Sequence, residues 1–399
     1  MKSYHIILYM GFVILLFSSC KKEEFSDIQA DFFTKFYGGS GEDGAGELIQ
    51  TSDDGYIFVG TKDLVNSTDI VVVKTDMYGN PVWEKTYGDS LNNIGNSIKA
   101  TADGSYIILG TTYIDLNQTD MHLLKIDSKG NVIFENLIGS NYSETGNSVI
   151  ETSEGEFVLV GTKQNDPDAA NSSLDICMVK ANAQGDSIWT RIVGGTADET
   201  ATGIIQNFDG NYVIIGSSES FAEVGQAKSN IFIVETNQNG IPITLMSYGG
   251  QENDHGSSVI QLDDGSYILV GTTESFGSGG KDVFVAKTAV GDIRTKEWET
   301  TFGGEKNDLG AHICLLKDAN YAIIGTTESF GNGDRDMYLV KFDGIGNEIF
   351  YRTFGSTGYD QGKYLIQTSD EGFGILGLTG FENNSMICIN KTNADGELK

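Results

Sequence analysis

The chain has 399 residues and a formal net charge of −30, from 56 acidic and 26 basic side chains. This surplus of negative charge argues against nucleic acid and anionic lipid surfaces as partners, because both carry the same sign of charge. Glycine is abundant, with 51 residues, and proline is rare, with 3, which is typical of many tight turns and few long linkers.

The N-terminus has the pattern of an export signal. Met1 and Lys2 provide a positive start, and the apolar run 6–17 is too short to span a bilayer as a helix. Residues 1–19 are therefore predicted to be a signal peptide that is removed from the mature protein.

The signal ends in a sequence that resembles the lipobox of bacterial lipoproteins, Leu16-Phe17-Ser18-Ser19-Cys20. The resemblance implies that Cys20 is lipidated and anchors the chain in a bacterial membrane, with residues 20–30 as a polar tether. The alternative is an ordinary signal peptide followed by an incidental cysteine.

The tether also bears on localisation. Lys21-Lys22-Glu23-Glu24 resembles the basic-then-acidic signals that send some Gram-negative lipoproteins to the outer cell surface. The same residues also fit a solvated spacer, which would leave the protein on the periplasmic face. We therefore expect an outer-membrane lipoprotein on one of these two faces.

A seven-fold repeat occupies residues 31–399. Its clearest mark is an aromatic or aliphatic residue followed by glycine, and the intervals between these glycines are 50, 51, 55, 55, 54 and 52 residues. A period of this size indicates a repeat architecture and not several unrelated domains. The glycines are Gly38, Gly88, Gly139, Gly194, Gly249, Gly303 and Gly355.

Each copy reads as four short strands. In the first copy the predicted strands are 47–51, 56–61, 69–74 and 82–87, and Asp54-Gly55 and Gly79 provide the turns between them. No segment has helical periodicity. Four antiparallel strands in about fifty residues, repeated radially, predict an all-β fold, a seven-bladed β-propeller.

The two ends of the repeat region are complementary. The seventh copy stops at Gly396, after its third strand, and residues 32–38 match the fourth-strand segment 82–88. An open ring would expose two sheet edges, which are aggregation hazards. We therefore predict that the N-terminal strand completes the last blade and closes the ring, and we expect a monomer.

The repeats resemble a known family. Trp298-Glu299-Thr300-Thr301-Phe302-Gly303-Gly304, together with 308–310 and 325–329, is similar to the bacterial seven-bladed propeller repeat family. The resemblance covers about residues 31–399 and implies the fold but no single activity. Cys177, Cys314 and Cys388 lie in apolar runs of different copies and are predicted to be buried free thiols.

Two sets of loops are candidate sites. The loop before each first strand carries an acidic or amide residue, followed two positions later by a small residue. A ring of such carboxylates could hold a hard, calcium-like cation, or each side chain could cap the backbone of its own loop. The acidic or amide residues are Asp43, Asn93, Glu144, Glu199, Asp254, Asp308 and Asp360.

The loop after the second strand has a shared Glu-Ser-Phe sequence in three adjacent copies. A phenylalanine in a polar loop is either an exposed contact for a partner or a plug on its own blade. The candidate binding residues are Glu219, Phe221, Glu274, Phe276, Glu328 and Phe330, together with His255, which follows Asp254.

The sequence contains no His-Glu-x-x-His, Gly-x-Ser-x-Gly or phosphate-loop motif. The leading hypothesis is therefore a lipid-anchored, non-catalytic scaffold that binds a protein or glycan partner on its loop face. The alternative is a cation-assisted hydrolase or lyase with a pocket at the channel mouth. Asymmetric acids and a His255 that points into the channel would favour the enzyme, whereas a symmetric ring of acids bonded to the backbone would favour the scaffold.

Overall fold

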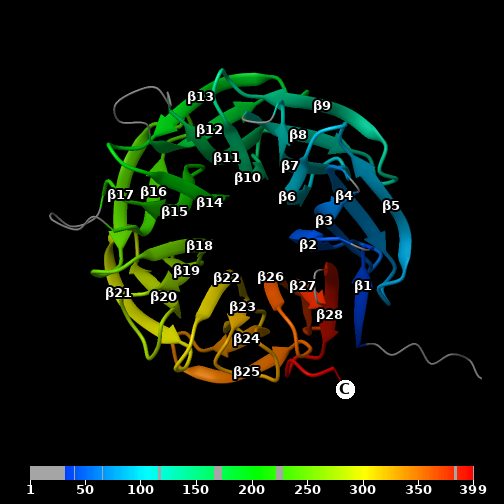
Figure 1. The fold of residues 1–399 in the computed structure, drawn as a ribbon. Coiled ribbons are helices and arrows are strands. Elements are labelled where there is room, and N and C mark those ends of the chain that lie inside the picture. Colours follow the sequence, from blue (N-terminus) through cyan, green and yellow to red (C-terminus); the bar gives the residue numbers. More distant parts are fainter. Residues whose placement is uncertain are drawn as a thin grey trace, which may run out of the picture. The chain divides into compact units, whose positions relative to one another are not determined.

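The repeats form a closed ring of seven four-stranded antiparallel sheets, shown in Figure 1. This computed structural model describes residues 32–39, 41–64, 66–115, 118–165, 173–221, 228–381 and 384–398. The predicted signal peptide, Cys20 and the tether lie outside the described residues. The predicted all-β, seven-bladed propeller is confirmed.

Blades 1 to 6 take their strands in chain order from the channel outward, and blade 7 adds the N-terminal strand at its rim. Blades 1 to 3 comprise β2 (Gly44–Gln50), β3 (Tyr56–Asp63), β4 (Thr68–Thr75), β5 (Pro81–Tyr87); β6 (Asn93–Ala100), β7 (Tyr106–Tyr113), β8 (Thr119–Ile126), β9 (Val132–Ile138); β10 (Glu144–Glu151), β11 (Phe157–Gln164), β12 (Leu174–Ala181) and β13 (Ser187–Val193). Blades 4 to 6 comprise β14 (Glu199–Gln206), β15 (Tyr212–Ser218), β16 (Asn230–Thr236), β17 (Pro242–Tyr248); β18 (Asp254–Gln261), β19 (Tyr267–Thr273), β20 (Asp282–Ala289), β21 (Asp292–Phe302); β22 (Asp308–Leu315), β23 (Tyr321–Thr327), β24 (Asp336–Phe342) and β25 (Glu348–Phe354). Blade 7 comprises β26 (Asp360–Gln367), β27 (Phe373–Phe381), β28 (Asn384–Thr392) and β1 (Phe33–Tyr37).

The inner strands are longer than the sequence predicted. β2 begins at Gly44, three residues before the predicted start at Glu47, because its pairing with β3 continues across a β-bulge between Ala45 and Leu48. The same shift occurs once in every inner strand. A bulge inserts an unpaired residue and re-aims its side chain, which period-two alternation does not reveal.

The predicted ring closure is confirmed. β1 pairs antiparallel with β28, with Phe33 opposite Lys391 and Tyr37 opposite Ile387. The Phe33 ring packs edge-on against Tyr56 of blade 1 at 6.1 Å between centroids. The Tyr37 hydroxyl donates a hydrogen bond to the Gly79 carbonyl at 2.8 Å, so the first strand contacts both the last blade and the first.

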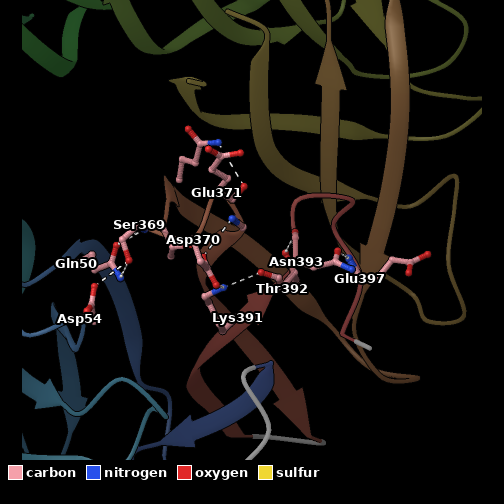
Figure 2. Close-up of polar contacts among 12 residues, drawn as sticks. Gln50, Asp54, Ser369, Asp370, Glu371, Lys391, Thr392, Asn393 and Glu397 are labelled. Carbon is pink, nitrogen blue, oxygen red and sulfur yellow. Dashed lines mark hydrogen bonds and ion pairs between the residues drawn. The ribbon is translucent and has the colours of Figure 1, made fainter. Parts of the chain in front are cut away.

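A second tie joins the first and last blades at their inner hairpins, as Figure 2 shows. The Ser369 N–H donates a hydrogen bond to Gln50 Oε1 at 2.8 Å, and the Ser369 hydroxyl donates one to Asp54 Oδ1 at 2.8 Å. Beside this contact, the Lys391 ammonium lies 2.8 Å from the Asp370 carboxylate. Closure therefore uses side chains near the axis as well as the strand at the rim.

The hydrophobic core lies between neighbouring blades. One cluster, for example, combines Val270 and Val285 of blade 5 with Ile323 and Phe342 of blade 6. The aromatic residue that begins the second strand of each blade is buried in this packing between blades. These residues are Tyr56, Tyr106, Phe157, Tyr212, Tyr267, Tyr321 and Phe373.

The described cysteines are all free thiols. Cys177 and Cys388 are buried free thiols, whereas Cys314 is also free but only partly buried. Within the ranges described, no helix has the length and apolar character needed to cross a membrane.

Candidate functional site

The inner strands surround a central channel with a cavity volume of about 1170 Å³. Figure 1 shows these strands, β2, β6, β10, β14, β18, β22 and β26, facing the middle of the ring. The channel is lined by residues from all seven blades, so it is the place where side chains of distant repeats meet.

The predicted acidic ring lies at the starts of the inner strands, and its members are buried. Asp308 Oδ2 accepts hydrogen bonds from the Gly304 N–H at 2.7 Å and from the Ser329 hydroxyl at 2.6 Å. Glu199 Oε2 accepts from the Gly195 N–H at 2.6 Å in the same way. These contacts are the backbone caps that the sequence analysis gave as the alternative to a cation site.

The ring of acids does not provide a metal-binding group among the described residues. Within the described part of the chain, no group of three or more His, Cys, Asp or Glu side chains is placed to hold a metal. The described residues that line the channel also do not include the six predicted acids, which are Asp43, Glu144, Glu199, Asp254, Asp308 and Asp360. The geometry therefore favours a structural role for each of these acids in its own blade.

The capping acids explain the glycine that marks every repeat. A Cβ on Gly303 would lie 2.0 Å from Asp282 Oδ1 and 2.8 Å from Asp308 Oδ2. The corresponding glycine of each other copy meets the equivalent carboxylate or amide, as Gly194 meets Asp175. The proximity of Asp308, together with burial as the larger cause, raises the pKa of Asp282. Glycine is required because one or two polar side chains occupy the space that a Cβ would need at these positions.

The three Glu-Ser-Phe loops fold back onto their blades. The Phe221 ring stacks on Phe232 at 5.1 Å, and the Phe330 ring lies 5.5 Å from Tyr338. Phe276 stacks on Phe284 at 6.0 Å and is 39% exposed. The phenylalanines therefore pack as plugs, which the sequence analysis gave as the alternative to partner contacts.

The acids of these loops differ in their contacts. Glu274 pairs with Lys281 at 2.9 Å, and Glu328 pairs with Arg335 at 2.8 Å. Glu219 is exposed at the end of β15. His255 is exposed beside Asp254, and its Nδ1 lies 3.3 Å from the Ser217 hydroxyl, outside the described channel lining.

A different cluster, which the sequence analysis did not single out, occupies the channel. The Lys99 ammonium donates to Glu47 at 2.8 Å and to the Tyr364 hydroxyl at 3.2 Å. The His312 ring stacks on Tyr364 with 3.8 Å between centroids. These four residues come from blades 1, 2, 6 and 7, and we call them the channel cluster.

The channel cluster is where the repeat pattern breaks. Each inner strand has one residue that pairs with the position just after the second-strand aromatic. This residue is isoleucine in most blades, for example Ile150 and Ile260, but it is Lys99 in blade 2 and Cys314 in blade 6. The residue two positions earlier is serine in blades 2, 3 and 5, and the remaining blades have other residues there. Three of these other residues belong to the channel cluster. They are Glu47, His312 and Tyr364. Aligning the copies on their second-strand aromatics would have revealed these substitutions from sequence.

The electrostatics of the cluster follow from burial and from Lys99. Burial and the neighbouring Lys99 charge lower the pKa of His312 to about 3, so its imidazole is neutral at pH 7. Burial also raises the pKa of Tyr364, and it raises the pKa of Cys314 to about 12. For Lys99, burial favours a lower pKa, but Glu47 and Tyr364 outweigh it and the pKa is raised. The cluster thus holds one ion pair and two neutral rings.

Sequence comparison finds limited similarity to known proteins. No protein-family model matches the chain. The chain is 26% identical over 228 residues to the regulatory protein FlaEY of Caulobacter vibrioides, covering 49% of this chain and 24% of that protein. It therefore spans about a quarter of the length of this curated relative.

Solved propellers share the architecture at low sequence identity. Sqt1 of Chaetomium thermophilum, bound to the N-terminus of ribosomal protein L10, is 10% identical with a TM-score of 0.51, covering 90% of this chain and 98% of that one. YCF48 bound to D1 peptide is 9% identical with a TM-score of 0.52, covering 91% and 96%. The polysaccharide lyase Uly1 is 10% identical with a TM-score of 0.55, covering 90% and 92%. What this chain shares with all three is the β-propeller fold.

Proposed function

We propose that this protein is an exported, lipid-anchored and monomeric scaffold that binds a polypeptide segment in its central channel. The observation that carries the proposal is the concentration of repeat-breaking side chains in one sector of the channel, in blades 6, 7, 1 and 2. Structural roles recur in every blade, whereas these residues occur once each. Loss of the repeat pattern at one place in a rigid ring favours a binding site there.

A protein partner is favoured over a glycan. Two propellers with this fold, Sqt1 and YCF48, were solved with a bound protein N-terminus and a bound peptide. The channel lining is mixed, with aliphatic residues such as Ile150 and Ile205 beside polar residues such as Asn96 and Asn147. Such a lining suits a peptide, which carries apolar side chains on a polar backbone.

The alternative, a lyase, draws on the Lys99–Tyr364–His312 contacts and on the fold shared with Uly1. Proton transfer is most efficient when the pKa of the catalytic group lies near the working pH. Burial instead raises the pKa of Tyr364 and brings that of His312 down to about 3. Both directions move these groups away from the pH range in which they would transfer protons, which argues against the lyase.

The class of partner is tested by direct binding. We expect the full chain to bind a pool of randomised octapeptides saturably, as measured by fluorescence anisotropy, and not to bind a pool of neutral and uronic-acid oligosaccharides. The physical reason is that the channel lining combines apolar and polar residues, as a peptide combines apolar side chains with a polar backbone. Binding of the oligosaccharides alone, or of neither pool, would overturn the proposal, and cleavage of the oligosaccharides would favour the lyase.

The anchor is tested separately by substitution of the predicted lipidated residue. Cys20→Ser is expected to release a soluble protein, because the acyl chains that hold the chain in the membrane attach to that thiol. The measurement is partition between membrane and soluble fractions after cell lysis. Unchanged membrane association would contradict lipidation at Cys20, and protease treatment of intact cells would distinguish surface display from the periplasmic face.

A further inference from the structure

Lys363 is a channel lysine without a countercharge. It lies on β26, lines the channel and is solvent-exposed there, and no ion pair joins it to any residue that the structure describes. Lys99, the other lysine of the lining, is paired with Glu47 at 2.8 Å. The protein that surrounds the channel partly desolvates the exposed ammonium and so lowers the pKa of Lys363. An unpaired ammonium in an enclosed space is stabilised by an anion from outside.

The position of Lys363 in the repeat explains why it is available. It is the bulge residue of its inner strand, between Gly362 and Tyr364. In blades 2 to 5 the bulge side chain donates a hydrogen bond to a carbonyl of the next blade. These bonds are Asn96 to Gly146 at 2.7 Å, Asn147 to Ala201 at 2.6 Å, Thr202 to Gly256 at 3.0 Å and Ser257 to Gly310 at 2.7 Å.

This circumferential chain of hydrogen bonds ends at blade 6, where the bulge residue is Ala311, and blade 7 has Lys363 in its place. An ammonium on a four-carbon stem reaches further into the lumen than the short amide and hydroxyl groups of the other blades. Lys363 therefore departs from the structural role that its position has in blades 2 to 5.

A second polar group in the same sector also lacks a partner. The imidazole of His312 stacks on Tyr364, the residue next to Lys363, and its Nδ1 is buried without a hydrogen bond among the described residues. Since the other ring nitrogen bonds the backbone of Leu365, Nδ1 of the neutral ring is the acceptor. An N–H or O–H donor is needed to satisfy it.

We propose that Lys363 binds the C-terminal carboxylate of a peptide in the channel, and that His312 Nδ1 accepts a hydrogen bond from an N–H group of the same peptide end. This inference rests on the proposed peptide-binding function. A peptide end supplies both the anion and the N–H donor, whereas an inorganic anion such as sulfate supplies only acceptors. A polyanionic glycan is disfavoured, because the lining also carries Glu47 and Glu151 and the chain has a net charge of −30.

The test compares two pools of randomised octapeptides that differ only at the C-terminus, with a free carboxylate in one and a carboxamide in the other. We expect the full chain to bind the carboxylate pool about 10- to 100-fold more tightly, as a charge-assisted hydrogen bond predicts. Lys363→Met should remove the difference, and Lys363→Arg, which keeps the charge, should retain a preference. Lys129→Met is the matched control, because it removes the same charge from an exposed turn.

The outcomes separate this inference from the function on which it rests. Equal binding of both pools, unaffected by Lys363→Met, would leave peptide binding in place and overturn recognition of the C-terminus. Binding of neither pool would overturn both. Displacement of the carboxylate pool by glucuronate or inorganic phosphate at equal concentration would overturn the peptide assignment and identify a sugar acid or a free ion as the ligand.

Discussion

Deletion of residues 32–37 is expected to lower the melting temperature by on the order of 10 °C and to cause aggregation. The deletion removes Phe33 from its contact with Tyr56 and Tyr37 from the buried core, and the loss of one buried aromatic costs roughly 3–5 kcal/mol. It also exposes β28 as an unpaired edge next to blade 1. Thermal unfolding followed by circular dichroism, with light scattering for aggregation, measures both effects.

Two controls bound this prediction. Removal of residues 21–26, which precede the propeller unit that begins at Asp31, should leave the melting temperature unchanged. Phe36→Ser, on the same strand but at a side chain that is 50% exposed, should have a small effect. A deletion of 32–37 that melts like the intact chain would contradict closure of the ring by β1.

Gly161→Ala is expected to destabilise the propeller by about 3 kcal/mol, the upper part of the range for overpacked cores. A Cβ at Gly161 would lie 1.7 Å from the Thr145 carbonyl oxygen and 2.7 Å from its carbon, and both atoms belong to the backbone of β10. Relief requires that β10 and β11 separate next to the bulge at Gly146. Urea unfolding at constant temperature gives the change in the free energy of unfolding.

The matched control is Gly344→Ala, in a turn where a Cβ meets no atom within 4 Å. Its free energy of unfolding should stay within about 0.5 kcal/mol of that of the unaltered chain. The same close approach recurs in every blade, at Gly60, Gly110, Gly161, Gly216, Gly271, Gly325 and Gly377. If Gly161→Ala were as stable as Gly344→Ala, the packing between first and second strands would be looser than the structure has it.

Much of the fold could be predicted because each copy repeats the same local signals. Asp54-Gly55 and Gly79 mark turns whose backbone needs positive φ, and Asp54 and Gly79 indeed have φ of 59° and 75°. The match of residues 32–38 to 82–88 predicted the pairing of β1 with β28, because sheet edges in a ring must be covered. Because the same pattern occurs seven times, an ambiguous strand or turn in one copy can be assigned from the other copies.

The inner strands and the channel cluster were harder to predict. The bulges break the alternation from which strands are inferred, so the start of β2 was placed at Glu47 and not at Gly44. The contact of Lys99 with Tyr364 joins residues separated by 265 positions, and the contact exists only once the ring is closed. Loop residues such as Phe276 were predicted as candidates because their motif recurs in several copies. Lys363 and His312 do not recur at the equivalent positions of the other copies, so no shared motif contains them.

The most direct test of the central claim is to return the channel cluster to the residues found in the other copies. The variant carries Glu47→Ser, Lys99→Ile, His312→Ser and Tyr364→Ser, and its binding of the octapeptide pool is compared with that of a loop variant carrying Glu219→Gln and Phe276→Ser. A binding site in the channel predicts at least a 10-fold loss of affinity in the folded channel variant and unchanged affinity in the loop variant. Full affinity in the channel variant, with the loss confined to the loop variant, would contradict the account and place the site on the loops.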